Sequence, residues 1–182
     1  MMRKFMIVFW TLITSTCFAQ QIDLTLVDKI GAKAEEKTEI NMDESMLKSA
    51  AGFLDNGNKA EALARESTKN VKGIYVRSYE FGGEGAYKRD DLKPLFDKLK
   101  APEWKQFLKS DEKDELTQIW MHTTNGMNDG LLLVSAESDE LTVINLVGAT
   151  NLADLAALGN LGNLEELENL GNLGNAGTAG GK

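Results

Sequence analysis

Cysteine and histidine are almost missing from this sequence, which has one residue of each in 182. A lone cysteine cannot make an intramolecular disulfide or a two-cysteine redox pair, and with one histidine it cannot build a Cys/His metal cage. Proline occurs only twice, and aromatic residues make up 7% of the chain. We therefore expect no metal and no other cofactor.

Basic residues are the scarcer of the two charge types, at 20 Lys and Arg against 28 Asp and Glu, a formal charge of -8. An acidic chain repels phosphate backbones, so we expect no nucleic-acid partner. The hydrophobic share of 42% and charged share of 26% are typical of a folded globular protein. The length suffices for one domain with a full core.

The most apolar stretch covers residues 5–13, about half of the ~20 residues that a membrane span needs. Arg3 and Lys4 precede it, and smaller, more polar residues follow to Ala19. This three-part order is typical of a secretory signal peptide, which we predict over 1–19. A lipoprotein acylated at Cys17 is the alternative, although the residues before it match a lipobox poorly. We predict an exported protein, periplasmic or secreted, with no transmembrane span in the mature chain.

Removal of residues 1–19 takes away two bases and no acid, so the remaining 18 bases and 28 acids give a formal charge of -10. The cysteine goes too. The mature chain would therefore contain no thiol for nucleophilic catalysis.

Residues 20–150 carry the patterns of one folded domain. Apolar residues at helical spacing predict helices over 24–36, 43–54, 59–69 and 90–100. Asp43 is the expected N-cap of the second helix, and Asp90 is that of the last. Runs rich in β-branched and aromatic residues predict strands over 71–81, 104–110, 116–123, 131–136 and 141–148, with a short strand possible at 38–42. We expect an α+β fold of two layers: an antiparallel or mixed sheet of about five strands with helices packed on one face.

Two features of the strands could carry function. Tyr75, Arg77 and Tyr79 alternate along one face of the strand 71–81. Aromatic residues with an arginine favour a recognition surface, but they equally suit packing against helices. His122 is the other feature, and it shares a strand face with Trp120. Without a Gly-x-Ser-x-Gly elbow we interpret it as structural or exposed, and we predict no catalytic residue and no enzyme.

Residues 151–182 form a tail of a different composition. Leucine recurs at every third position from Leu152 to Leu173, and Leu-Gly-Asn occurs four times. We expect a helix that starts near Asn151 and a disordered end from about residue 174. The alternative is that the leucines dock on a partner or pack between copies of the protein, through Leu161, Leu164, Leu167, Leu170 and Leu173.

Three stretches resemble a known family. They are Lys72-Gly-Ile-Tyr-Val-Arg-Ser-Tyr-Glu-Phe81, Glu84-Gly-Ala-Tyr87, and Glu140-Leu-Thr-Val-Ile-Asn-Leu-Val-Gly148 followed by Leu152. The chain is similar, over roughly residues 22–158, to the domain-of-unknown-function 4252 family of exported bacterial proteins. The resemblance implies a small secreted or envelope-anchored α+β domain and supplies no catalytic residues. The repetitive tail departs from the family pattern.

These observations favour a non-enzymatic interaction or sensing module of the bacterial envelope, with a protein partner of unknown identity and possible homo-oligomers through the tail. Two alternatives stay open. One is a binder of a small hydrophobic or peptide ligand between helices and sheet, and the other is a hydrolase that uses paired carboxylates.

Overall fold

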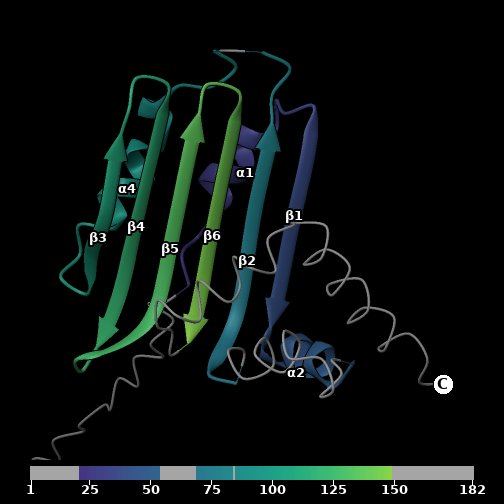
Figure 1. The fold of residues 1–182 in the computed structure, drawn as a ribbon, viewed down its shortest axis with the longest axis vertical. Coiled ribbons are helices and arrows are strands. Elements are labelled where there is room, and N and C mark those ends of the chain that lie inside the picture. Colours follow the sequence, from purple (N-terminus) through teal and green to yellow (C-terminus); the bar gives the residue numbers. More distant parts are fainter. Residues whose placement is uncertain (1–20, 54–68, 84, 149–182) are drawn as a thin grey trace, which may run out of the picture.

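The computed structural model describes residues 21–53, 69–83 and 85–148, which form a six-stranded antiparallel sheet with helices (Figure 1). The strand order is β1-β2-β6-β5-β4-β3. The strands are β1 (Glu36–Asp43), β2 (Val71–Glu80), β3 (Trp104–Asp111), β4 (Glu115–Thr124), β5 (Met127–Glu137) and β6 (Glu140–Gly148). The expected α+β class is confirmed, and the strand number of about five is corrected to six. The difference is β1, an edge strand of eight residues whose whole length pairs with β2.

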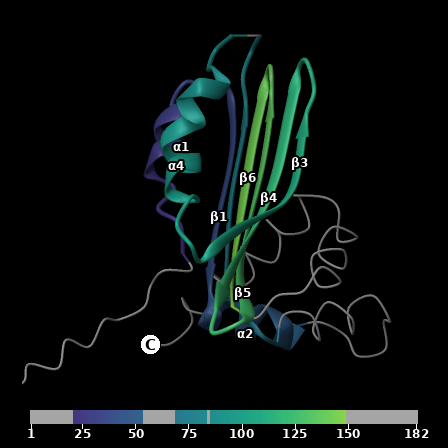
Figure 2. The same ribbon diagram turned by 90° about the vertical axis from the view of Figure 1, so that its left-hand side faces the viewer.

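The helices lie on both sides of the sheet. They are α1 (Thr25–Gly31), α2 (Glu44–Phe53), the 3₁₀ turn η1 (Arg89–Leu92) and α4 (Lys93–Lys98). Figure 2 shows α1 and α4 on one face, called here the helix face, and α2 at one end of the sheet. Leu47 of α2 packs with Met42 and Ile74 on the opposite side, called here the far face. The expectation that every helix covers one face is therefore wrong for α2.

The predicted signal peptide and tail lie outside the described residues, as does the predicted helix 59–69 except for its last residue.

Local chemistry sets the helix boundaries. Asp43 is confirmed as the cap of α2, because its Oδ1 accepts the backbone N–H groups of Ser45 and Met46, each at 2.9 Å. The prediction of Asp90 as a cap is wrong: the carboxylate of Asp91 instead accepts the N–H of Lys88 at 2.9 Å. Helix α1 ends at Gly31, short of the predicted 36, because the chain is already in β1 from Glu36.

The β4–β5 hairpin turns at Asn125 and Gly126, whose φ angles are 52° and 79°. Two successive left-handed residues make the turn that matches the twist of a hairpin, and Asn-Gly is the pair that favours it. The strands predicted over 116–123 and 131–136 leave seven residues between them, but the turn between β4 and β5 takes only Asn125 and Gly126. Strand β5 therefore begins at Met127 instead of 131.

The main core lies between the helix face and the helices. Strands β5 and β6 present alternate residues to it, and α1 and α4 add their own apolar sides. Its fully buried members include Val27, Leu92, Leu95, Leu99, Leu132, Val134, Leu141 and Val143.

Candidate functional site

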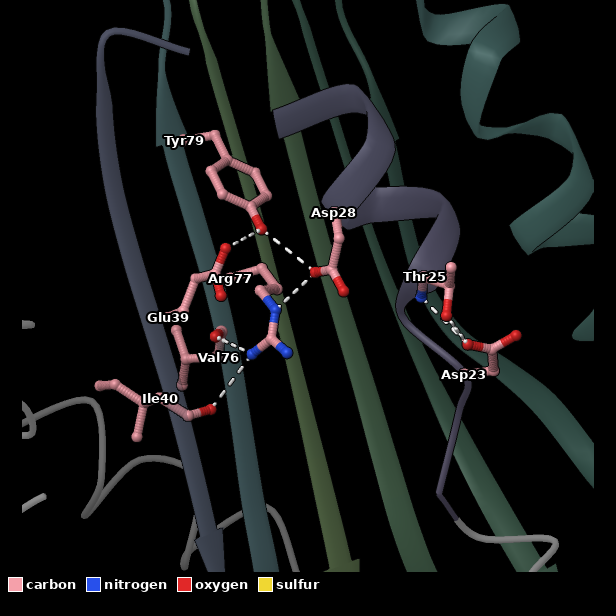
Figure 3. Close-up of polar contacts among 8 residues, drawn as sticks. All are labelled: Asp23, Thr25, Asp28, Glu39, Ile40, Val76, Arg77 and Tyr79. Carbon is pink, nitrogen blue, oxygen red and sulfur yellow. Dashed lines mark hydrogen bonds and ion pairs between the residues drawn. The ribbon is translucent and has the colours of Figure 1, made fainter. Parts of the chain in front are cut away.

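Two of the three residues of the possible recognition surface are buried on the helix face. Tyr79 is completely buried and Arg77 is 8% exposed, while Tyr75 is half-buried. Arg77 donates from Nε to Asp28 of α1 at 2.7 Å and from Nη1 to the carbonyl of Val76 at 2.8 Å (Figure 3). Arg77 and Tyr79 are buried in this conformation, which favours the packing alternative over a recognition surface at these two residues.

The same network fixes α1 on the sheet. The hydroxyl of Tyr79 lies 3.2 Å from Asp28 Oδ1 and 3.0 Å from Glu39 Oε1, so one phenol joins α1 to β1 (Figure 3). Burial and the two carboxylates raise the pKa of Tyr79, which keeps the phenol protonated and able to donate. We conclude that Arg77 and Tyr79 are structural.

His122 lies on the same face of β4 as Trp120, as predicted. That face is the helix face, and His122 is buried there. Its Nδ1 lies 2.6 Å from Oδ1 of Asp129, and its ring stands edge-on to Trp104 with centroids 5.0 Å apart. Nε2 has no hydrogen-bond partner among the described residues. In a catalytic triad the histidine faces the substrate and the acid is buried behind it. Here the histidine is the more buried, at 1% against 16% for Asp129, which does not favour nucleophile activation.

Two hollows open on the described surface. One, of about 480 Å³, lies between α1 and the η1–α4 segment, with Leu26, Ile30, Ala86, Tyr87 and Pro94 among its lining residues. Its lining also includes Lys29 of α1, Lys33 just after α1, and Asp90 and Asp91 of η1. The other, of about 380 Å³, lies near the ends of β2 and β6, with the β4–β5 turn and Asp129 on its wall.

The far face is organised in rows that cross the sheet. Directly paired residues in an antiparallel sheet point to the same side, so the register defines each row. One row contains only serine and threonine, one from every strand: Thr38, Ser78, Thr142, Ser135, Thr117 and Ser110. We call it the hydroxyl row. Ser78 and Thr142 are hydrogen-bonded within it at 2.8 Å.

A row of glutamates follows at the end of the sheet away from α2. Glu36 pairs with Glu80, Glu80 pairs with Glu140, and Glu115 pairs with Glu137. Thr117 and Thr142 each donate to the glutamate two residues before them, at 2.9 Å. These bonds place the hydroxyl row and this glutamate row on the same face.

The closeness of these glutamates affects the protonation of one of them. The pKa of Glu137 is raised, first by partial burial and then by the charges of Glu140, Glu115 and Asp139. The far face is therefore strongly negative at this end.

On the other side of the hydroxyl row the far face is apolar. The next row also takes one residue from every strand: Ile40, Val76, Ile144, Leu133, Ile119 and Leu108. We call it the upper apolar row. The lower apolar row, nearer α2, is Met42, Ile74, Leu146, Leu131 and Met121. The far face thus changes from carboxylate to hydroxyl to hydrocarbon along the strands.

A sequence model of the family described as "Domain of unknown function (DUF4252)" matches residues 32–158. The chain belongs to this family. No curated protein and no solved structure matches the chain. The DUF4252 match includes all six strands and continues ten residues past the end of β6.

Sequence reasoning missed the rows, although a signal was present. Serine or threonine stands two residues from a glutamate in five strands of the DUF4252 domain, as Glu36-x-Thr38, Ser78-x-Glu80, Glu115-x-Thr117, Ser135-x-Glu137 and Glu140-x-Thr142. A spacing of two keeps both side chains on one face of a strand. The repetition therefore indicated a shared face, but only the register could align it.

The other candidate residues are the leucines of the predicted tail. Outside the described residues and beyond the end of the DUF4252 match lie Leu161, Leu164, Leu167, Leu170 and Leu173.

In the part of the chain that the structure describes, no helix is long and apolar enough to cross a membrane. Nor do three or more His, Cys, Asp or Glu side chains in that part come together as metal ligands.

Proposed function

We propose that this DUF4252 protein is an exported, non-enzymatic interaction module of the bacterial envelope, and that it binds a partner protein through the far face of its sheet. The observation that carries the proposal is the alignment of the hydroxyl row beside the glutamate row. Hydroxyls at neighbouring strand positions about 4.8 Å apart offer regularly spaced donors and acceptors. The carboxylates beside them favour a partner surface that presents lysine or arginine.

The test is a crosslinking pull-down from intact cells with three forms of the protein. They are the full chain, the chain truncated after Thr150, and the double variant Glu36→Lys, Glu80→Lys. Both glutamates are exposed, Glu36 as the first residue of β1 and Glu80 as the last residue of β2, so the fold should tolerate the change. A matched control is Glu103→Lys, Asp90→Lys, which changes the charge equally at exposed positions outside the rows.

We expect a partner that the full chain and the control capture and the row variant loses. A partner retained by the row variant would contradict the far face as its site. Loss on truncation after Thr150 would instead assign binding to the tail. If no form captures a partner, the interaction proposal is wrong.

Export has its own test. We expect the protein recovered from the envelope or medium to begin at Gln20, and N-terminal sequencing would show this directly. Retention of Met1 would contradict a cleaved signal peptide. A lipid on Cys17 would identify the lipoprotein alternative.

The hollow between α1 and the η1–α4 segment favours a second candidate function. Its volume of about 480 Å³ is in the range of small-ligand sites, and its floor is largely apolar. We propose a small hydrophobic or peptide ligand as the alternative occupant. Native mass spectrometry of the purified protein should then show a bound mass that Ala86→Trp, which fills the hollow, removes. An unliganded spectrum for both proteins would count against this alternative.

The hydrolase alternative has less support. A hydrolytic pair needs two carboxylates in a cleft, one with a raised pKa. Glu137 has the raised pKa, but it is exposed at the end of the sheet and lines neither of the two hollows described above.

A further inference from the structure

The apolar rows of the far face need a cover that α2 supplies only in part. Helix α2 packs against β1 and β2, and its Leu47 joins the cluster formed by the lower apolar row. The upper apolar row runs on across the other strands. There Ile144, Leu133 and Ile119 are half-buried, and Leu108 is 39% exposed.

The chain leaves the sheet beside these rows. Gly148, the last residue of β6, pairs with Val71 at the end of the sheet where α2 lies. Its φ of 114° and its approach to Asn70 require glycine, because a Cβ would lie 2.3 Å from the Asn70 carbonyl oxygen. The backbone is therefore fixed at Gly148, two residues after Leu146 of the lower apolar row.

The sequence just after Gly148 has the pattern of a helix with one apolar side. In an α-helix a step of three residues turns by about 300°, so Leu152, Leu155 and Leu158 lie within an arc of about 120°. That arc is the width of the apolar stripe of a helix packed on a core. Continued steps of three carry the later leucines round to the other sides. The stripe therefore ends near Leu158, which is also where the DUF4252 match ends.

We propose that residues 151–158 form a helix on the far face, with Leu152, Leu155 and Leu158 packed on the apolar rows over β6 and β5. Eight helical residues are about 12 Å long. A helix about 10 Å in diameter covers roughly two strands at their ~4.8 Å spacing. Asn151 is suited to cap its first turn.

This assignment divides the far face into two parts. The chain itself covers the apolar rows, and the hydroxyl and glutamate rows stay free for a partner. The second half of that statement rests on the proposed function. The intramolecular contact does not, and it can be tested with no partner present.

The test measures distances between spin labels in the full chain carrying Cys17→Ser, which removes its only cysteine. One label is placed at Asp154→Cys. The second is placed at Ser135→Cys, in the hydroxyl row of β5, or at Pro94→Cys, exposed on α4 and on the helix face. We expect a short, narrow distance distribution for the Ser135 pair and a longer one for the Pro94 pair.

Each other outcome overturns the proposal. Broad distributions for both pairs would mean that the segment does not dock. A shorter distance to Pro94 would place it on the helix face. Loss of the Ser135 signal on dilution with unlabelled protein would show that the segment docks on a second copy.

A substitution series tests the side chains. Leu152→Asn, Leu155→Asn, Leu158→Asn should broaden the Ser135 distribution and increase binding of an apolar dye. The matched control Leu167→Asn, Leu170→Asn, Leu173→Asn should change neither measurement. Equal effects in both variants would contradict a specific role for residues 151–158. If the first variant fails to fold, the label distances in the otherwise unchanged chain still decide the question.

Discussion

The two faces of the sheet are built on different plans. The helix face mixes aliphatic, aromatic and polar side chains, and polar groups such as Arg77, Asp28 and Tyr79 bond to one another inside the molecule. The far face separates its chemistries into rows. Four of its five glutamates are exposed, and its hydroxyls are half-buried except for Ser78, which is buried. A face that only stabilises the fold does not need such order. The difference is the main reason to look for function on the far face.

Two neighbouring leucines of β5 make the comparison directly. Leu132 is fully buried on the helix face, and Leu133 is half-buried on the far face. We expect Leu132→Ala to lower the free energy of unfolding by about 2–5 kcal/mol, because it opens a cavity in a closed core. Leu133→Ala should cost roughly 1 kcal/mol, since less apolar area is removed from water. Urea denaturation measures both, and equal losses would contradict the distinction between the faces.

A glycine on the helix face should show how tightly α1 is seated. A Cβ at Gly31 would lie 2.4 Å from the ring of buried Tyr79. We expect Gly31→Ala to cost about 1–3 kcal/mol, because either the helix or the ring must shift. Gly52→Ala is the control, since a Cβ there meets no atom within 4 Å. The same urea denaturation measures both variants. If Gly31→Ala lowered the free energy of unfolding no more than Gly52→Ala does, α1 would be free to adjust its position.

The Tyr79 hydroxyl tests the polar anchor of α1. Tyr79→Phe keeps the ring and removes the single O–H donor that Asp28 and Glu39 share. We expect a loss of about 1–2 kcal/mol, because both acceptors are carboxylates. Tyr75→Phe serves as control, since the Tyr75 hydroxyl has no hydrogen bond to a described residue. Thermal unfolding compares the two variants. Equal shifts of the melting temperature would mean that the Tyr79 hydroxyl does not anchor α1.

The smallest effect should appear in the glutamate row. Because the folded-state pKa of Glu137 is raised, its charge opposes folding above that pKa, and the opposition fades as the pH falls through it. Glu137→Gln should therefore raise the melting temperature at pH 7 and have no effect near pH 4. Solvent screening of this exposed group keeps the gain below about 1 kcal/mol.

Salt provides a further check on this prediction. The gain from Glu137→Gln should shrink at high ionic strength, because salt screens the repulsion within the row. Glu103→Gln, outside the row, should give no comparable gain. A gain for Glu137→Gln that is independent of pH would contradict its electrostatic origin.

Local patterns in the chain determined a large part of this protein. The Asp43 cap, the Asn125-Gly126 turn and the antiparallel succession of β3 to β6 all depend on residues close in sequence, and each was predictable. The alternation along β4 likewise placed Gln118, Trp120 and His122 on one face. Such features follow from backbone preferences and from a two-residue period, which a single strand displays by itself.

Only the tertiary structure decided which faces are covered and which residues meet. The alternation of Arg77 and Tyr79 along β2 was compatible with an exposed face or with a buried one. The packing of α1 on that face decided that they are buried. The Ser/Thr–x–Glu spacing recurs in separate strands, but it becomes a surface only when six strands pair in one register. The physical reason is that strand register and helix docking depend on contacts between residues distant in sequence, which no local pattern contains.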